Sequence, residues 1–201
     1  ICPQLVSREL YDMLAFCVYC YTRTSGCFDV TIHSANYMPN SIHTIQLSPQ
    51  ERTLFFPQLG MTINLSGFLK GYALEKIREL LQYYEVKNAL INMGNSSVLA
   101  LGHHPLGDGW KVGFGSVSQE KTHVELLLQN ECLTTSGNDS HERKHIINPQ
   151  SGKLVEGKRK VAVVTADGAV GEVLSTSLFV ADSHQRKFLE AEFHPRLIFD
   201  L

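Results

Sequence analysis

The sequence predicts an α+β fold in which helices pack against a mixed sheet. Of its 201 residues, 43% are hydrophobic and 19% are charged, a composition typical of a chain that buries a substantial core. Segments with helical periodicity interleave with short β-branched segments, without the regular strand–helix–strand spacing of a doubly wound fold. The sequence contains no internal repeat and no low-complexity segment. We therefore expect a single domain over residues 1–201.

Charge, cysteine content and hydropathy argue against several classes of protein. Eighteen Lys and Arg against twenty Asp and Glu leave a net charge of -2, whereas a nucleic-acid binder normally has a basic surplus. Five cysteines are too scattered for a disulfide framework, and the Cys17–Cys20 pair lacks the second pair that a zinc site needs. No apolar run is long enough to span a membrane. No signal peptide opens the chain, which favours the cytoplasm; a periplasmic or membrane-anchored location follows if a leader has been removed.

The N-terminal part is expected to contain two helices joined by irregular chain. Apolar residues recur at helical spacing over residues 7–23, and Ser7 is placed to cap that helix. A short extended segment is expected at residues 27–33, followed by short strands and turns over residues 34–66. A second helix is expected over residues 68–84. Its apolar face is predicted to consist of Ala73, Ile77, Leu80, Leu81 and Tyr84.

The C-terminal part is expected to supply most of the sheet. Strands are predicted at residues 89–93, 98–101, 110–114, 124–128, 161–165 and 197–199, and helices at residues 169–181 and 185–193. The glycine-rich segment 102–109 lacks G-x-G-x-x-G spacing, so we interpret it as a turn between strands rather than a phosphate-binding loop. Residues 133–149 are polar and rich in small side chains, which is typical of a functional loop.

Five groups of residues stand out by their order along the chain. They are Thr24-Ser-Gly-Cys-Phe28-Asp29; Asn64-Leu-Ser-Gly67-Phe-Leu-Lys70-Gly71-Tyr72-Ala73; Ala89-Leu-Ile-Asn92-Met-Gly94; Thr134-Thr135-Ser136-Gly137 with His145-Ile-Ile-Asn148-Pro149-Gln-Ser-Gly152; and Val161 to Ala166 with Gly171-Glu172-Val-Leu-Ser-Thr176-Ser-Leu178. Glu172 and Thr176 are four residues apart on an expected helix, so their oxygens share one face. Taken alone, this pair is better explained as a solvated helix face, and Lys70 as a surface lysine.

In order and spacing, these segments resemble the FAD:protein FMN transferases of the ApbE type. That family shows T-G-x-F-D, D-L-G-G-x-x-K-G-Y-A, N-x-G-G-D, T-S-G, H-I-I-D-P-x-T-G and A-D-A-L-A-T in this order. The similarity runs from Val6 to about Phe199. It implies an ApbE-like, T-fold-related architecture and an enzyme that uses FAD and Mg²⁺ to attach FMN to a threonine of a partner protein, releasing AMP. The acceptor threonine would lie in a context of roughly Asp-small-x-Thr.

The resemblance also implies which residues hold the ligands, although it names no catalytic residue. Gly67, through its carbonyl, Glu172 and Thr176 would hold the metal, which neutralises charge on the pyrophosphate during cleavage. FAD would contact Cys27, Phe28, Asp29, Asn64, Lys70, His145 and Ile146. A flavin needs a flat apolar slot with hydrogen-bonding edges, and Phe28 and Ile146 have the side chains for such a slot.

The sequence departs from the family pattern chiefly at acidic positions. Asn64 and Asn148 stand where the motifs have aspartate, Glu172 is longer than aspartate by one methylene, and Gly94-Asn95-Ser96 replaces G-G-D. Family members also carry a sheet-forming segment before the first helix, and its absence leads us to expect an open pocket edge and a homodimer that covers it. Two other hypotheses stay open: a non-catalytic flavin-binding or interaction protein of the same fold, and an FAD pyrophosphate hydrolase.

Overall fold

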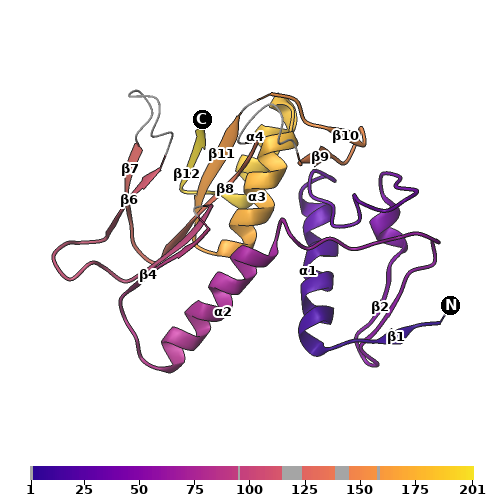
Figure 1. Ribbon diagram of the computed structural model, residues 1–201, viewed down its shortest axis with the longest axis horizontal. Coiled ribbons are helices and arrows are strands. Elements are labelled where there is room, and N and C mark those ends of the chain that lie inside the picture. The colour runs from indigo at the N-terminus through magenta and orange to yellow at the C-terminus, as the bar shows by residue number, and fades with distance from the viewer. Residues whose placement is uncertain (1, 95, 115–123, 139–144, 158) are drawn as a thin grey trace.

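A five-stranded antiparallel sheet lies at the centre of the protein (Figure 1). The computed structural model describes residues 2–94, 96–114, 124–138, 145–157 and 159–201. The strand order is β12 (Leu197–Asp200), β11 (Lys160–Thr165), β8 (Glu131–Gly137), β5 (Ser97–Leu101) and β4 (Ala89–Met93). In this register Thr134 pairs with both Ser97 and Val163. Together with the helices below, the sheet confirms the expected α+β fold, but its pairings are all antiparallel, so the expectation of a mixed sheet is wrong.

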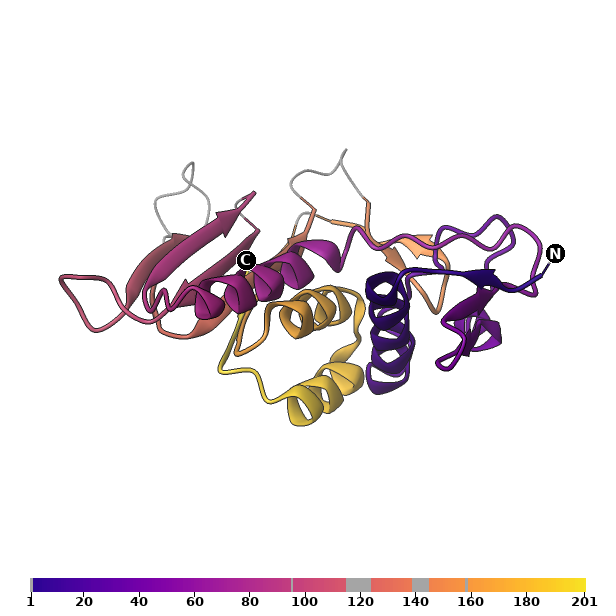
Figure 2. The same cartoon turned by 90° about the horizontal axis from the view of Figure 1, so that it is seen from below.

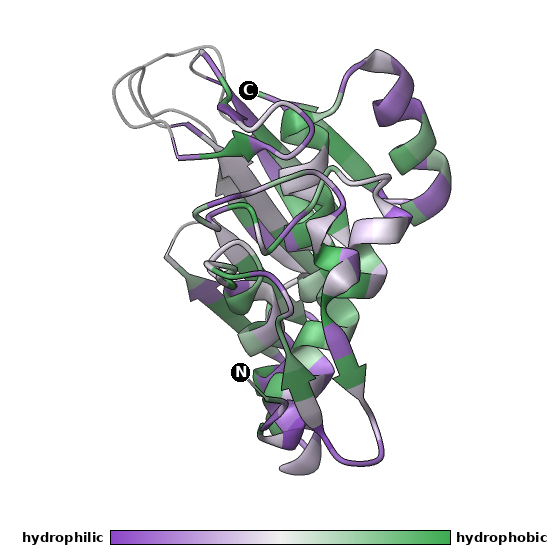
Figure 3. Ribbon diagram, turned by 90° about the vertical axis from the view of Figure 1, so that its right-hand side faces the viewer, coloured by the Kyte–Doolittle hydropathy of each residue, from purple (hydrophilic) through white to green (hydrophobic). Residues whose placement is uncertain are grey.

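The two faces of the sheet carry different layers. The hairpin of β6 (Trp110–Phe114) and β7 (Val124–Leu128) covers one face, and α2 (Leu69–Tyr83) and α3 (Gly168–Val180) cover the other (Figure 1). Side chains alternate along a strand, so β8 directs Leu133 to the hairpin and Cys132 and Thr134 to the helices. Figure 3 shows hydrophobic stretches along the strands and helices in the middle of the molecule.

The central helix is α3, which is buried on nearly all sides. Asp167 caps it by accepting a 2.8 Å hydrogen bond from the amide of Val170. Its apolar residues, such as Leu174 and Phe179, pack against β11 and α4 (Ser183–Phe193). Ten of its 13 residues are buried, and the helix lies between the sheet and α1 (Figure 2). Asp182 and Gln185 form a capping box at the start of α4.

The N-terminal residues form a second lobe on the far side of α3 (Figure 2). Helix α1 (Arg8–Arg23) packs there with a small sheet whose order is β1 (Gln4–Leu5), β3 (Thr53–Phe55) and β2 (Gln46–Ser48), and with a 3-10 turn, η1 (Ser41–Thr44). A separate two-stranded ribbon pairs β9 (Ile147–Asn148) with β10 (Lys153–Leu154). The lobe is joined to α3 through an apolar cluster that includes Cys17, Phe28, Phe68, Ala169 and Val173. No helix in the described part of the chain is long and apolar enough to cross a membrane.

The structure confirms the predicted helices and strands to within about two residues at their ends, including the Ser7 cap of α1, which accepts from the amide of Leu10 at 3.1 Å. The segment 102–109 is a turn between β5 and β6, as predicted.

Three local predictions are wrong. Residues 30–33 turn rather than extend, because the carboxylate of Asp29 accepts from the amide of Thr31 at 2.7 Å. Residues 133–137 lie in strand β8, where alternating buried side chains outweigh their polar composition; residues 139–144 of that expected loop lie outside the described part of the chain. On α2, Leu80 and Tyr84 are exposed, whereas Gly71 and Leu74 are buried.

The cysteines lead to a prediction about thiol chemistry. Cys17, Cys20, Cys27 and Cys132 are buried and Cys2 is exposed. Burial raises the pKa of Cys20 and Cys132 to about 12 and that of Cys27 to about 11. Because the thiolate is the reactive form, one thiol of the folded protein should react quickly with Ellman's reagent at pH 8, and the others only after unfolding. Rapid reaction of two or more thiols in the native protein would contradict the packing.

Candidate functional site

Glu172 is a carboxylate buried between two helices and the sheet. Glu172 lies on α3 and is 3% exposed. Its side chain packs against α2 at Gly71, where an added Cβ atom would lie 2.6 Å from Cγ of Glu172. The Ser97 hydroxyl, at the start of β5, donates a hydrogen bond to Oε1 of Glu172. Burial raises the pKa of Glu172, while the Ser97 hydrogen bond and the charge of Lys70 oppose that shift.

Lys70 reaches the same place from the first turn of α2. Its ammonium donates to the hydroxyl of Ser96, whose Oγ lies 3.5 Å from Oγ of Ser97. Three elements far apart in sequence therefore bring together Lys70, Ser96, Ser97 and Glu172, which we call the carboxylate cluster. An ammonium near a buried carboxylate offsets part of the cost of removing that charge from water.

A row of hydroxyl groups continues from the carboxylate cluster along α3. Oγ of Ser136 on β8 lies 2.8 Å from Oγ of Ser175 and 2.9 Å from Oγ1 of Thr176. Oγ1 of the fully buried Thr134 has no hydrogen-bond partner in the described part of the chain, and it would lie 2.7 Å from a Cβ added to Gly171. Thr176 is thus placed one turn from Glu172, among oxygens rather than apolar groups.

The relative direction of α2 and α3 locates Gly67. Oε1 of Glu75 on α2 accepts from the amide of Gly168, the first residue of α3, at 2.7 Å. One turn earlier on α2, Gly71 packs against both Gly168 and Glu172. The helices therefore run antiparallel, and Gly67 lies two residues before α2, whose N-terminal end faces residue 172 rather than the start of α3. A Cβ atom at Gly67 would meet nothing within 4 Å, so this glycine is not closely packed.

The other expected ligand residues lie at the border between the two lobes. Cys27 and Phe28 are 2% and 4% exposed, and Phe28 packs in the apolar cluster around α1. The amide of Asn64 donates to the carbonyl of Val30 at 2.8 Å, which places Asn64 beside the segment that carries Asp29. His145 is exposed, and Ile146 packs against β11 and α3.

Tyr37 joins two of these segments, and sequence reasoning missed it. Its hydroxyl lies 3.0 Å from Oδ2 of Asp29 and 2.9 Å from the carbonyl oxygen of Pro149. Burial raises the pKa of Tyr37, and the neighbouring Asp29 raises it further, so the hydroxyl keeps its proton. No local pattern marks this tyrosine, because its partners are 8 and 112 residues away.

A profile of the ApbE family matches residues 2–197 of this chain. The chain belongs to the ApbE family. Among curated relatives, an FAD:protein FMN transferase of Klebsiella pneumoniae (strain 342) is 28% identical over 137 residues, which cover 63% of this chain and 41% of the relative. One of Chlamydia pneumoniae is 26% identical over 163 residues, which cover 75% of this chain and 49% of the relative. The chain thus spans about half or less of the length of these relatives.

Solved structures show the same fold. The apo form of the flavinyl transferase ApbE from Pseudomonas stutzeri aligns with a TM-score of 0.83 at 18% identity, over 99% of this chain and 69% of the other. The ApbE protein from Thermotoga maritima aligns with a TM-score of 0.81 at 20% identity, over 98% of this chain and 74% of the other. At these identities the likeness establishes the ApbE architecture of the chain.

Within this ApbE-family chain, the donor set at Glu172 fits a magnesium ion. In the described part of the chain, Oε2 of Glu172 has no hydrogen-bond partner, so one carboxylate oxygen is available. No group of three or more His, Cys, Asp or Glu side chains that could hold a metal exists among the described residues. Mg²⁺ usually binds through one or two carboxylates and keeps several waters, so one carboxylate with hydroxyl and carbonyl oxygens suits it.

The asparagine of the histidine motif has a structural function in this ApbE-family chain. Nδ2 of Asn148 donates to the carbonyl of Val180 at the end of α3 at 3.3 Å, and its Oδ1 accepts from the amide of Gln150 at 2.9 Å. An aspartate accepts but does not donate, and it would place negative charge at the negative end of the helix dipole. The amide at this position therefore secures the motif segment to α3.

This contact predicts the effect of restoring the motif's aspartate. Asn148→Asp should lower the free energy of unfolding by about 1–2 kcal/mol, because it removes a hydrogen bond and introduces repulsion at the helix end. Gln150→Glu adds the same charge to an exposed side chain and is the matched control. Urea unfolding measures both. Equal midpoints for the two variants would mean that the Val180 contact contributes nothing.

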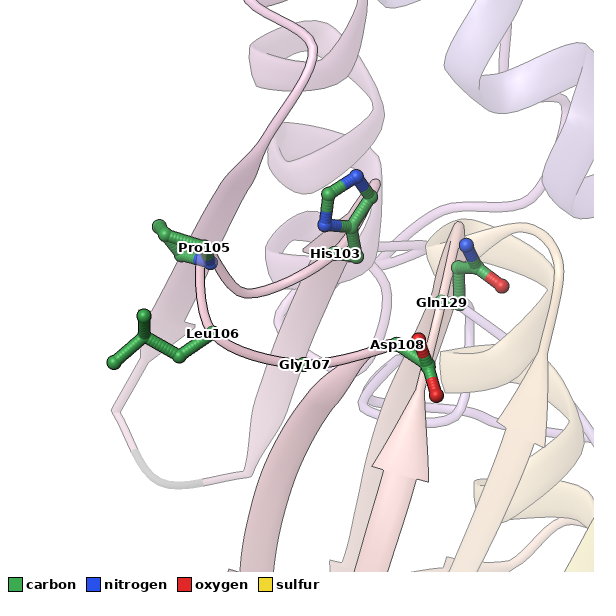
Figure 4. Close-up of a pocket in the computed structure, with 6 residues that line it drawn as sticks. All are labelled: His103, Pro105, Leu106, Gly107, Asp108 and Gln129. Atoms are coloured by element: carbon green, nitrogen blue, oxygen red, sulfur yellow. The ribbon is translucent and has the colours of Figure 1, made fainter.

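One surface hollow lies away from the motif residues. It has a volume of about 590 Å³ and is lined by His103, Pro105, Leu106, Gly107, Asp108 and Gln129 (Figure 4). Leu106 is 90% exposed and points away from the loop, and the neighbouring His104 accepts from the amide of Leu106 and packs edge-on against Trp110. We interpret this hollow as the open side of a structural turn.

Proposed function

We propose that this chain carries the flavin-nucleotide site of an FAD:protein FMN transferase. The observation that supports this most strongly is the buried carboxylate of Glu172, which accepts from Ser97 through one oxygen and lies near the charge of Lys70, one helical turn before Thr176. A buried charge is costly unless it has a partner or a ligand, which marks this position as a functional site. The names of the similar proteins from Klebsiella pneumoniae and Chlamydia pneumoniae support a flavin nucleotide as the ligand.

The proposed reaction moves FMN from FAD to a threonine of a partner protein. The threonine oxygen attacks the phosphorus of the FMN half and forms a phosphoester bond. The bridging P–O bond of the pyrophosphate breaks, AMP leaves, and the hydroxyl proton of the threonine passes to solvent. Attack by water instead of threonine would give FMN and AMP, which is the hydrolase alternative.

The residues of this chain bind and orient FAD in the proposal. Gly67, Glu172 and Thr176 would hold Mg²⁺, which supplies positive charge at the pyrophosphate when bound. Lys70 adds a fixed cation one turn into α2. The following residues would line the flavin site: Cys27, Phe28, Asp29, Asn64, Lys70, His145 and Ile146. Because Phe28 and Ile146 are buried, they would form the apolar floor of the flavin site.

A flavin-binding and transfer assay tests the proposal. FAD is titrated with and without Mg²⁺, followed by its fluorescence, and a peptide with an Asp-small-x-Thr sequence is then added. AMP release together with a peptide heavier by FMN supports the transferase. AMP and FMN without an adduct indicate a hydrolase, and FAD binding without AMP indicates the non-catalytic alternative. Absence of FAD binding contradicts the proposal as a whole.

We propose a second copy of this chain as a further partner. In the described part of the protein, no strand pairs with the outer edge of β4, and Leu90 on that strand is 42% exposed. An unpaired strand edge is a template for another strand, and a net charge of -2 gives little repulsion. Sedimentation at micromolar concentration should give twice the 22.5 kDa of one chain. A species of 22.5 kDa at every concentration would contradict this.

A further inference from the structure

Ser97 is a buried polar residue in an otherwise apolar strand. It opens β5, whose other residues are Val98, Leu99, Ala100 and Leu101, and it is 0% exposed. The alternation of the strand directs its hydroxyl toward α3. A buried hydroxyl needs a hydrogen-bond partner, and Ser97 has the carboxylate of Glu172, from a residue 75 positions away.

The side chain of Glu172 needs such support because of its length. It has one more rotatable bond than the aspartate of the A-D-A-L-A-T motif. Its carboxylate can therefore adopt more conformations, and fixing it in one of them costs more side-chain entropy. Packing already restricts the aliphatic part of the Glu172 side chain, because its Cγ lies in the space that the missing Cβ of Gly71 leaves open. The hydroxyl of Ser97 fixes the remaining rotation by holding Oε1.

The two oxygens of Glu172 have different surroundings. Oε1 accepts from Ser97, and Oε2 has no partner among the described residues. On the other side of the hydroxyl pair, Ser96 accepts from Lys70, so the ammonium is held at the same corner. The hydrogen bonding therefore orients one oxygen inward and leaves the other for a ligand.

We propose that Ser97 is a positioning residue that holds Oε1 of Glu172 so that Oε2 faces a divalent cation. The inference rests on the proposed function, in which Glu172 is the carboxylate ligand of Mg²⁺. Hydrogen bonds to the ligands of a metal orient them, and removing such a partner typically weakens metal binding by about 10–100-fold.

Metal binding without FAD tests this directly. Mg²⁺ is titrated into the protein, and its binding is followed by calorimetry and by the melting temperature. The melting temperature rises because Mg²⁺ binds the folded state. Ser97→Ala should raise the Mg²⁺ midpoint by about 10-fold or more. Ser97→Cys keeps the volume with a weaker donor and should also raise it, and Ser97→Thr keeps the hydroxyl and should retain the wild-type midpoint.

Ser177→Ala is the matched control. It removes another fully buried hydroxyl of the same region, one that donates to the carbonyl of Val173 on its own helix. Its apo melting temperature is expected to fall while its Mg²⁺ midpoint stays unchanged. Wild-type midpoints in both Ser97→Ala and Ser97→Cys would overturn the inference alone. A wild-type protein without any Mg²⁺ response would overturn the metal assignment of Glu172, and the inference with it.

Discussion

Gly71→Ala is expected to lower the free energy of unfolding by about 3 kcal/mol or more, beyond the usual cost of overpacking a core. A Cβ atom at this position would lie 2.1 Å from the carbonyl oxygen of Gly168 and 2.6 Å from Cγ of Glu172. The first of these atoms is backbone and has no alternative rotamer, so α2 and α3 must separate. Chemical unfolding followed by circular dichroism measures the loss.

Gly67→Ala is the control for this prediction. It makes the same chemical change four residues earlier, where the added Cβ atom meets nothing within 4 Å. Its stability should stay within about 0.5 kcal/mol of wild type, as for substitutions away from packed sites. If Gly71→Ala were as stable as Gly67→Ala, the close contact of α2 and α3 would be wrong.

Glu172→Gln should abolish the Mg²⁺ response that we propose, with a loss of affinity of at least about 100-fold. The amide has the same size and its oxygen still accepts from Ser97, so the fold should be kept. The substitution removes the negative charge of the single carboxylate in the proposed ligand set. Because burial of this charge is costly, the apo variant should be as stable as wild type or more stable.

Glu79→Gln is the matched variant, since it removes the same charge from α2 at an exposed position paired with Lys76. Its Mg²⁺ midpoint should equal that of wild type. Calorimetric titration of the three proteins separates the outcomes. If Glu172→Gln kept its full response to Mg²⁺, the metal would have to bind elsewhere in the chain.

Much of the fold follows from local sequence. Ser7 caps α1 as expected, and Asp167 and Asp182 begin the next two predicted helices after β11, because capping depends on residues within one turn. The hairpin of β6 and β7 has the predicted ends, since two β-rich segments are recognisable without knowledge of their neighbours. The order of the motifs in turn led to the ApbE family, which the family profile confirms.

The predictions that failed concern which groups each segment meets in space. The buried residues of α2 are Gly71 and Leu74 rather than Leu80 and Tyr84, and the side chains of Glu75 and Arg78 lie partly buried beside them. Glu75 accepts from the first amide of α3, and Arg78 donates to the carbonyl of Ala166, two residues before α3, at 2.8 Å, so polar contacts contribute to the rotation of α2. The hydrophobic periodicity of a helix does not reveal hydrogen bonds between polar side chains and a neighbouring element.

The sequence by itself determined the helices, four of the five strands of the central sheet, the family and the identity of the residues to consider as ligands. Only the tertiary structure decided what these residues do for one another. It pairs Glu172 with Ser97, brings Lys70 to Ser96, and uses the amide of Asn148 to secure α3. The physical reason is range: capping and periodicity act within a few residues, whereas the surroundings of a buried charge are formed by elements that meet only when the chain has folded.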